Sequence, residues 1–445
     1  MTGEDVLELH IHGGPATVKA VLAAIPACST PKIVRYAEPG EFTRRAFFND
    51  RLDLAQVEAL SDALSAETEQ QRRAAVRGNS GALGRTYDGW RELLLYARGE
   101  IEALIDFSED QHFDESPTEL LTNVTRQVKE ILAHIQVHEV ASQRSELLRN
   151  GIRIALLGPP NVGKSSLMNQ IVGREASIVS TEAGTTRDII EASLDIRGFL
   201  CSFADTAGFR GHQGSAESPD RNIGAVEAEG IHRARQRALD SDIIIVLASV
   251  EFGKHGLPMI QYDRETLQLA AKAGSHLVAI NKRDSVDHGV FSKLAQEFRR
   301  DVLAQVPGLS KAEPIFISCK EAQTGPSALE DPGGVQLLIE QLAQAFASMT
   351  SMPVDLQDLL GVTERQRQLL VKCRAHLEDF MAEAQPGEEG IEADIVLAAE
   401  HLRYAATCLA KITGRGEFGD VEEVLGVIFE KYTHSQSHQA HGESS

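Results

Sequence analysis

Hydrophobic and polar residues follow different patterns in different parts of the chain. Residues 6–12 alternate one by one, which predicts a strand with Leu7, Leu9 and Ile11 on one face. From Leu52 to Ala75 the apolar residues recur every three or four positions, which predicts an amphipathic helix. Another helix is predicted where one stripe carries Leu120, Val124, Val128, Ile131 and Ile135.

Short β-type runs become frequent after Asn150. Helical stretches separate several of these runs, which lie at 152–157, 200–204, 242–248, 277–280 and 314–318. Such alternation predicts an α/β domain with a mainly parallel sheet. After about Met352 the helical spacing returns. We expect a short last helix at 421–429 and, before it, a helix with one face formed by Leu397, His401, Tyr404, Cys408 and Ile412.

These changes of pattern predict how the chain is divided. Its 445 residues suffice for two or three domains. We expect an α/β domain at 150–350, inserted into a helical domain whose two parts span 49–149 and 351–432, with residues 1–48 as a separate N-terminal part. The polar, low-complexity segment 433–445 is expected to be disordered.

Composition excludes several classes of protein. The net charge of −21 argues against a globally basic nucleic-acid binder, although a local basic patch is compatible with it. The five cysteines show no C-x-x-C spacing, which argues against a zinc site or disulfide framework built from them and suits a reducing compartment. No run approaches the ~18 apolar residues of a membrane span. No presequence is visible, since the acidic Glu4 and Asp5 follow Met1 closely.

A phosphate-binding motif stands at 158–165, which reads Gly-Pro-Pro-Asn-Val-Gly-Lys-Ser and fits G-x-x-x-x-G-K-[ST]. It follows a predicted strand and opens a helix, as this motif requires. Lys164 would offset charge at the β- and γ-phosphates during catalysis, and the Ser165 hydroxyl would ligate Mg²⁺. The expected nucleotide contacts are Asn161, Val162, Gly163, Lys164, Ser165 and Ser166.

Two further segments would serve the phosphate and Mg²⁺ side. Residues 205–208 read Asp-Thr-Ala-Gly; Asp205 would support the Mg²⁺ shell, Gly208 would offer its N–H to the γ-phosphate, and the motif also includes Thr206 and Ala207. Residues 184–188, Gly-Thr-Thr-Arg-Asp, lie where such GTPases have their first switch. Thr186 would give a second hydroxyl to Mg²⁺ and take part in catalysis. Thr185 would contact the nucleotide, with ordinary turn chemistry as its alternative role.

Two other segments would recognise the base. Residues 281–284, Asn-Lys-Arg-Asp, follow a predicted strand. A carboxylate there can accept both N–H groups of the guanine edge, which adenine cannot offer, so Asp284 would select guanine beside Asn281 and Lys282. The next predicted strand ends at Ser318, Cys319 and Lys320. This segment would place a backbone N–H near the guanine oxygen.

With these motifs the chain resembles the MnmE (TrmE) family of tRNA-modification GTPases over nearly its whole length. The resemblance also rests on residues 2–9 and 12–14, on 39–56, on Leu402-Arg-Tyr-Ala and on Ile412-Thr-Gly. It implies an α/β P-loop GTPase domain inserted into an α-helical domain. Residues 1–48 would be a remnant of an α+β folate-binding-type N-terminal domain.

The resemblance implies a K⁺-assisted mechanism. G domains of this family dimerise across the nucleotide, and K⁺ takes the place of an arginine finger between the β- and γ-phosphates. Glu227 matches the family's catalytic glutamate and would orient the attacking water, although without the resemblance it would be an ordinary helix glutamate. The positions that match the K⁺ ligands are Asn161, Ser180, Glu182 and Thr185.

The resemblance also implies partners. A homodimer would modify the wobble uridine of tRNA with a carboxymethylaminomethyl- or taurinomethyl-type group, together with a flavin-dependent protein of the MnmG/GidA type and a formyl-tetrahydrofolate donor. Glu8 and Arg51 match two folate contacts, with Arg51 in place of a lysine. Eukaryotic members act in mitochondria, which is the expected location; the bacterial cytoplasm is the alternative. No membrane partner is expected.

Three departures from the family keep other functions open. Most of the family's folate domain lies upstream of Thr2, so a complete folate site is not expected here. Thr433 and Gln436 stand where family chains carry a cysteine and a lysine, and residues 211–223 lengthen the segment before Glu227. A GTP-binding regulatory form without modification chemistry is therefore one alternative. A ribosome-assembly GTPase, which would share the G domain, is the other.

Overall fold

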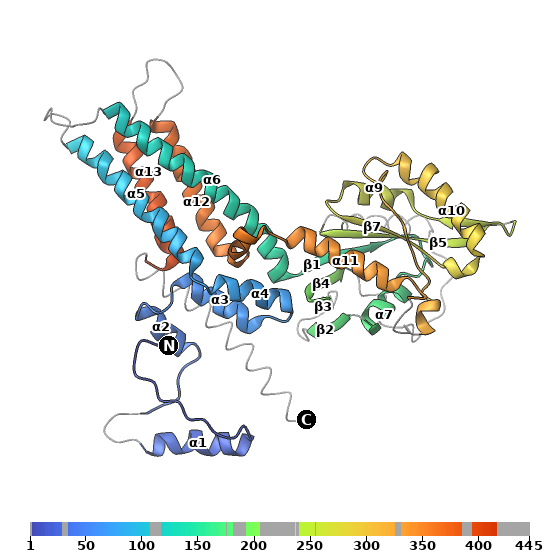
Figure 1. Cartoon of the computed structure of the whole chain (residues 1–445), viewed down its shortest axis with the longest axis horizontal. Coiled ribbons are helices and arrows are strands. Elements are labelled where there is room, and N and C mark those ends of the chain that lie inside the picture. Colours follow the sequence, from blue (N-terminus) through green and yellow to red (C-terminus); the bar gives the residue numbers. More distant parts are fainter. Residues whose placement is uncertain are drawn as a thin grey trace, which may run out of the picture. The chain divides into compact units, whose positions relative to one another are not determined.

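The computed structural model describes residues 2–28, 34–106, 117–174, 176–180, 193–204, 236, 240–253, 255–324, 331–384 and 394–415. The chain separates into two compact units (Figure 1). Unit 1 comprises Met1–Ser65, Ala74–Gln143 and Val354–Ser445, and unit 2 comprises Ala66–Arg73 and Arg144–Pro353. The helix predicted at 421–429 and the tail at 433–445 lie outside the described residues.

Unit 2 contains a mixed sheet. Its described strands are β1 (Ile152–Leu157), β2 (Ala176–Ser180), β3 (Ser193–Ile196), β4 (Phe199–Ala204), β5 (Ile243–Phe252), β6 (Pro258–Gln261), β7 (His276–Asn281) and β8 (Ile315–Phe316). They lie in the order β2-β3-β4-β1-β5-β7-β8, with β6 beside β5. The pairs β1–β4, β1–β5, β5–β7 and β7–β8 are parallel, and the pairs that involve β2, β3 or β6 are antiparallel. The prediction of an α/β domain with a mainly parallel sheet is confirmed.

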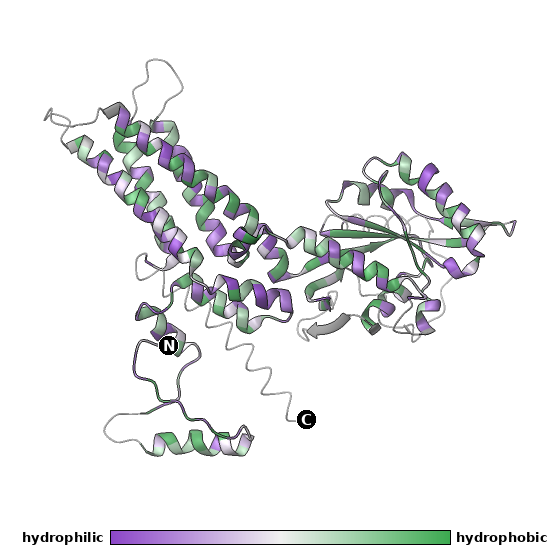
Figure 2. Ribbon diagram, in the orientation of Figure 1, coloured by the Kyte–Doolittle hydropathy of each residue, from purple (hydrophilic) through white to green (hydrophobic). Residues whose placement is uncertain are grey.

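The apolar runs of the sequence form the middle of this sheet. All of residues 243–250 in β5 are buried, because a central parallel strand is covered on both faces. Figure 2 shows the central strands as hydrophobic and the helices as mixed. Leu267, Phe291 and Phe298 pack against β5 and β7 from two of the helices. The described helices that lie wholly in unit 2 are α7 (Lys164–Arg174), α9 (Arg264–Lys272), α10 (His288–Asp301), α11 (Val335–Thr350) and the short η2 (Arg283–Ser285), η3 (Leu303–Gln305) and η4 (Glu321–Thr324).

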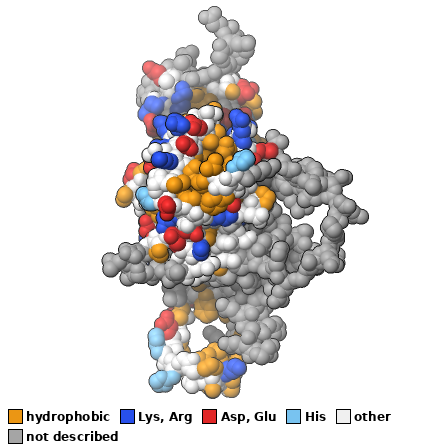
Figure 3. Space-filling model, turned by 90° about the vertical axis from the view of Figure 1, so that its right-hand side faces the viewer, with side chains coloured by type: hydrophobic (Ala, Val, Ile, Leu, Met, Phe, Trp, Pro, Cys, Tyr) orange, Lys and Arg blue, Asp and Glu red, His pale blue; other side chains and the backbone are white. Residues whose placement is uncertain are grey.

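Some apolar surface of unit 2 stays exposed. Phe252, Leu257 and Met259, at the β5–β6 hairpin, are 56%, 71% and 52% exposed. In the view of Figure 3, hydrophobic side chains gather in the middle of the described surface, with charged side chains around them. Such patches are typical of surfaces that meet a partner.

None of the described helices is both long enough and apolar enough to cross a membrane.

Unit 1 is helical. The described elements that lie wholly in unit 1 are α1 (Pro15–Ala27), α2 (Glu41–Phe48), α3 (Leu54–Ser65), α5 (Ala82–Asp106), η5 (Val354–Gly361), α12 (Glu364–Ala384) and α13 (Ile395–Thr413). The division between the units falls inside α4 (Glu69–Gly78) and α6 (Pro117–Asn150). Figure 1 shows α5, α6, α12 and α13 side by side. The stripe predicted for α6 is confirmed at Val124, Val128, Ile131 and Ile135, each at most 3% exposed, whereas Leu120 is only half-buried.

The helix predicted from Leu52 to Ala75 is two helices, α3 and α4. Between them the backbone N–H of Thr68 donates to Gln71 Oε1 at 3.0 Å. A threonine followed three residues later by a glutamine is the spacing of a capping box, which starts a new helix. The apolar spacing continues across the break, so hydrophobic periodicity alone gave one helix where the chain forms two.

The face predicted for α13 is wrong in part. Leu397 and Tyr404 are 42% and 43% exposed, although Cys408 and Ile412 are buried as expected. Small side chains form much of the buried face, because they let α13 pack closely against α12 and α5. The residues on that face include Ala398, Leu402, Ala405, Ala406 and Leu409.

Two predicted strands also differ. Residues 6–12 form no strand, and Leu7 is 85% exposed. An alternating sequence becomes a strand only where another strand pairs with it, and none of the described residues pairs with this segment. The strand predicted at 314–318 is limited to β8, because the N–H of Ser318 donates instead to the Gly333 carbonyl at 2.8 Å.

A buried carboxylate joins three helices of unit 1. Glu58 of α3 is 8% exposed and accepts hydrogen bonds from Arg365 Nε (2.6 Å), Gln366 Nε2 (2.7 Å) and Thr363 Oγ1 (3.2 Å). The Arg365 guanidinium also donates to two carbonyls in the last turn of α13, at 2.9 and 3.0 Å. Each polar group depends on the others, since burial removes water as an alternative partner.

Replacing this carboxylate should destabilise unit 1. We expect Glu58→Ala to cost about 3–5 kcal/mol of unfolding free energy, because it removes the counter-charge of a partly buried guanidinium and the acceptor of the buried Gln366 amide. Denaturant unfolding followed by the emission of Trp90, the single tryptophan, reports on unit 1. The control is Glu364→Ala, whose partner Arg367 is more exposed, and it should cost less than about 1 kcal/mol. Equal costs for the two variants would contradict the assignment.

Candidate functional site

The predicted phosphate loop lies between β1 and α7. Gly158 and Gly163 have φ angles of 153° and 99°, and Asn161 has a φ of 63°. A Cβ at Gly158 would lie 2.2 Å from the Leu247 carbonyl oxygen, and one at Gly163 would lie 2.2 Å from Asn281 Nδ2. Both glycines are therefore required by space and by backbone conformation.

Lys164 and two serines begin helix α7. The Lys164 ammonium donates to the carbonyls of Gly158 and Pro159 at 2.8 and 2.7 Å, so its charge lies against the loop. Ser165 and Ser166 are exposed in the first turn of the helix. A helix N-terminus presents backbone N–H groups and a positive dipole end, which favours phosphate.

Asn281 connects the phosphate loop to the base-side segments. The side chain lies at the end of β7 and is 2% exposed. Its Nδ2 donates to the Val162 carbonyl at 2.8 Å, and its Oδ1 accepts from the Cys319 N–H at 3.2 Å. One amide therefore ties the segments 158–163, 281–284 and 318–320 together.

Asp284 is oriented by a buried hydroxyl. Its Oδ1 accepts a hydrogen bond of 2.6 Å from Ser318 Oγ, and that hydroxyl accepts from the Glu321 N–H at 3.0 Å. A carboxylate has about four lone-pair sites, so a carboxylate with one such bond can accept further donors. This capacity is what recognition of the guanine edge requires.

The neighbouring residues play different parts. Lys282 has a left-handed φ of 61°, and its ammonium forms an ion pair with Glu251 of β5. Burial raises the pKa of the Cys319 thiol to about 11, so the thiol is protonated and the backbone N–H makes the contact to Asn281. Lys320 is exposed.

Several contacts were missed because they depend on long sequence separations. Arg283, which the motif leaves unspecified, bonds to Glu321 at 3.3 Å and to the carbonyls of Phe316 and Pro332. Glu251 follows a long apolar strand and belongs to no motif. Only its place at the end of β5, beside β7 in the sheet, could have indicated a role near the base.

Most of the other predicted site residues lie outside the described residues. The backbone of Ser180 ends β2, whereas the remaining switch and catalytic candidates lie outside the described residues: Glu182, Thr185, Thr186, Asp205, Thr206, Ala207, Gly208 and Glu227. In unit 1, Arg51 lines a cavity of 480 Å³. Glu8 is exposed beside His10 at 3.6 Å and is not among the residues that line this cavity.

Known proteins identify the family. The family model described as "MnmE helical domain" matches residues 54–432, and "GTP-binding protein TrmE N-terminus" matches residues 1–51. The tRNA modification GTPase MnmE of Parvibaculum lavamentivorans is 38% identical over 434 residues, which cover 97% of this chain and 83% of the relative. This chain belongs to the MnmE family of tRNA modification GTPases.

Other MnmE-type relatives come from eukaryotes. The mitochondrial "5-taurinomethyluridine-[tRNA] synthase subunit GTPB3" of Danio rerio is 36% identical, with 97% of this chain and 78% of the relative covered. The mitochondrial "tRNA modification GTPase MSS1" of Saccharomyces cerevisiae is 33% identical, with 97% and 76% covered. The chain is therefore a GTPase, and the recognition of the MnmE family from its motifs is confirmed.

Asp284→Asn should change the base preference of this MnmE-type site. The amide replaces one acceptor oxygen by a donor, which opposes the guanine amino group but suits the carbonyl that xanthine carries there. We expect affinity for GDP to fall roughly 100-fold or more and affinity for xanthosine diphosphate to rise. Titration with fluorescent analogues of both nucleotides measures this.

The matched control for that variant is Asp287→Asn, an exposed aspartate three residues further along the chain. It should leave both affinities unchanged. If Asp284→Asn weakened the two nucleotides equally, the carboxylate would not be the group that distinguishes the bases.

Proposed function

We propose that this chain hydrolyses GTP with K⁺ as activator, through dimerisation of its G domain, in the modification of the tRNA wobble uridine. The observation that carries the proposal is the anchoring of the phosphate loop and both base-side segments by Asn281. Because one buried amide fixes all three, guanine and triphosphate would be bound by a single preorganised edge.

The domain arrangement supports this function. We infer a G domain at 150–350, inserted into a helical domain formed by 49–149 and 351–432, with residues 1–48 belonging to a folate-binding-type domain. In support, unit 2 interrupts unit 1 along the sequence, and the TrmE N-terminal family model matches the first residues of the chain.

The phosphate side would be served by Lys164 and by Mg²⁺. The ammonium of Lys164, already directed at the loop, would stand beside the β- and γ-phosphates. Hydroxyl oxygens suit a hard cation such as Mg²⁺, and the exposed Ser165 fits this role; Thr186 would be the second hydroxyl, with Asp205 in support. Bound Mg²⁺ would offset charge on the phosphate oxygens.

Activation by K⁺ would depend on a second set of oxygen ligands. Asn161 is exposed at the tip of the phosphate loop with a φ of 63°, a position from which a side-chain amide can reach outward. Ser180, Glu182 and Thr185 would complete the set. Bound K⁺ would supply the charge that other GTPases take from an arginine, and Glu227 would orient the attacking water.

The tRNA chemistry is inferred from the relatives. The name of the Danio rerio relative states a 5-taurinomethyluridine-[tRNA] synthase subunit. We infer a carboxymethylaminomethyl- or taurinomethyl-type modification, carried out with a flavin-dependent partner of the MnmG/GidA type and a formyl-tetrahydrofolate donor. A mitochondrial location matches the names of the eukaryotic relatives, and the bacterial cytoplasm matches the bacterial ones.

One observation favours a second candidate function. Glu8 is exposed and is not among the residues that line the cavity of Arg51, so the two predicted folate contacts are not brought together. A GTP-binding regulatory form, which dimerises but lacks the modification chemistry, fits this separation. A ribosome-assembly GTPase is disfavoured, because the family model of the helical domain covers 54–432.

Potassium dependence tests the mechanism. We expect GTP hydrolysis to be roughly tenfold or more faster in KCl than in NaCl, because K⁺ completes the charge around the transferred phosphoryl group. Glu227→Ala should lower turnover in KCl by about 100-fold, since it removes the group that orients water. Steady-state phosphate release at equal ionic strength measures both effects.

The control is Glu229→Ala, two residues further along the same segment, which should retain full K⁺ stimulation. Hydrolysis that is absent or indifferent to K⁺, while GTP still binds, would reject the proposed mechanism and favour the regulatory form.

A further inference from the structure

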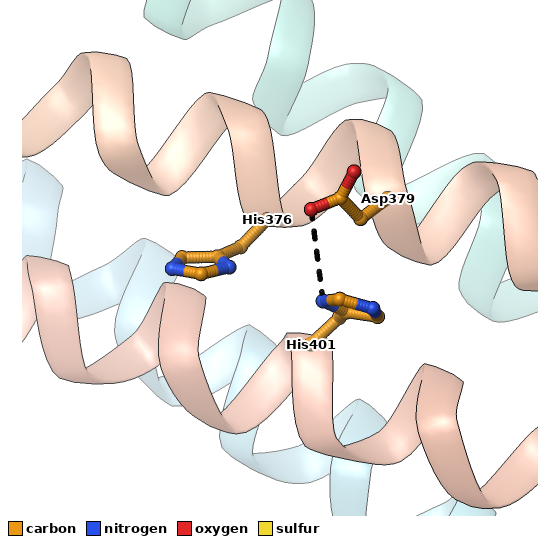
Figure 4. A group of neighbouring side chains, drawn as sticks. All are labelled: His376, Asp379 and His401. Carbon is orange, nitrogen blue, oxygen red and sulfur yellow. Dashed lines mark ion pairs between the residues drawn. The ribbon is translucent and has the colours of Figure 1, made fainter.

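Unit 1 contains a cluster of metal-ligating side chains that the nucleotide chemistry does not use. His376 and Asp379 belong to α12, and His401 belongs to the neighbouring α13. One ligand atom from each residue lies within 4.8 Å of the other two. Figure 4 shows the three side chains converging from the two helices, with the Asp379 carboxylate directed at the His401 ring.

Helix geometry explains the convergence. His376 and Asp379 are three residues apart, which places them on the same face of α12. His401 approaches from α13, whose small side chains allow the two helices to lie close together. His401 Nδ1 lies 3.9 Å from Asp379 Oδ2, which is too long for a hydrogen bond but suits two ligands of one ion.

Both histidines carry a buried nitrogen without a partner. The Nδ1 atoms of His376 and His401 are shielded from water and find no hydrogen-bond partner among the described residues. Buried polar atoms are normally satisfied, so an unpartnered Nδ1 in each of these two neighbouring histidines indicates a missing partner. A cation between the rings would accept both lone pairs at once.

Neighbouring aromatic groups fix the orientation of the rings. The Tyr404 ring centroid lies 5.3 Å from that of His376, at an interplanar angle of 31°. Tyr404 belongs to α13, and the guanidinium of its neighbour Arg403 lies 4.7 Å from the centroid of the Tyr404 ring. The His376 and His401 rings are 6.1 Å apart. These contacts restrict the rotation of the His376 ring.

We propose that His376, Asp379 and His401 form a Zn²⁺ site, with water completing the coordination. Two imidazoles and one carboxylate suit Zn²⁺, whereas Mg²⁺ and Ca²⁺ prefer all-oxygen shells. Bonds of about 2.0–2.2 Å in a tetrahedral arrangement would bring the donor atoms to roughly 3.3 Å from one another. Side-chain rotation supplies this closure. The bound ion links α12 to α13 and stabilises unit 1.

Metal titration of the full chain tests the proposal. Protein stripped with a chelator is titrated with Zn²⁺ by calorimetry and with Co²⁺ by visible absorption, without nucleotide. We expect one Zn²⁺ per chain and a Co²⁺ spectrum of low coordination number. His376→Ala, His401→Ala and Asp379→Asn should each weaken binding by about tenfold or more, because each removes a ligand.

Matched variants identify the ligands. Glu378→Gln and Glu400→Gln change the carboxylates adjacent to Asp379 and His401, and both should bind Zn²⁺ as the parent chain does. A triple His434→Ala, His438→Ala, His441→Ala variant removes the histidines of the C-terminal tail. Loss of binding in this triple variant alone would overturn the site, as would no saturable binding.

Stability provides a second readout. Zn²⁺ that binds only the folded chain should raise the unfolding midpoint reported by Trp90 in α5. The conservative Asp379→Asn change affects a half-exposed side chain and is not expected to disturb the fold. If Asp379→Asn and both histidine variants retained the midpoint without metal and the full Zn²⁺-dependent rise, the cluster would not be the site.

Discussion

The buried amide of Asn281 donates to the Val162 carbonyl and accepts from the Cys319 N–H, and the edge of unit 2 that carries the predicted nucleotide contacts depends on these two bonds. An aspartate would place a negative charge against a carbonyl, and an apolar residue would leave buried backbone groups unpaired. Gly163 is equally constrained, because any side chain there would occupy the space of the amide. The edge therefore requires both the amide of Asn281 and a glycine at position 163.

Around this centre the base side has supports of its own. The Ser318 hydroxyl orients Asp284, while Arg283 reaches Glu321 and two backbone carbonyls. Lys282 is held by Glu251. These contacts keep charged and polar groups in fixed directions before any ligand arrives, and such preorganisation lowers the cost of binding.

Local patterns predicted much of the fold and of the candidate site. The run 152–157 matched β1, because Ile152, Ile154 and Leu157 are apolar and buried within the sheet, although the strand also carries the exposed Arg153. The phosphate motif and the segment 281–284 were found because their spacing is short. The break between α3 and α4 was also readable from Thr68 and Gln71, but apolar periodicity concealed it.

What stayed hidden depends on distance along the chain. Asn281 and Val162 are separated by 119 positions, and Lys282 and Glu251 by 31, so no window of sequence contains either pair. The strand expected at 6–12 failed for a related reason. Pairing is a property of two segments, and the alternation of one segment cannot supply the other.

The alanine-lined face of α13 has a consequence for inherited variation. At Ala398, Ala405 and Ala406 the Cβ is the whole side chain between closely packed helices. Valine or leucine there would wedge the helices apart, and glycine would weaken α13 itself. These positions are remote in sequence from every nucleotide motif. Variants at these positions would therefore lower the amount of folded protein in the cell. The activity of each correctly folded molecule would be unchanged.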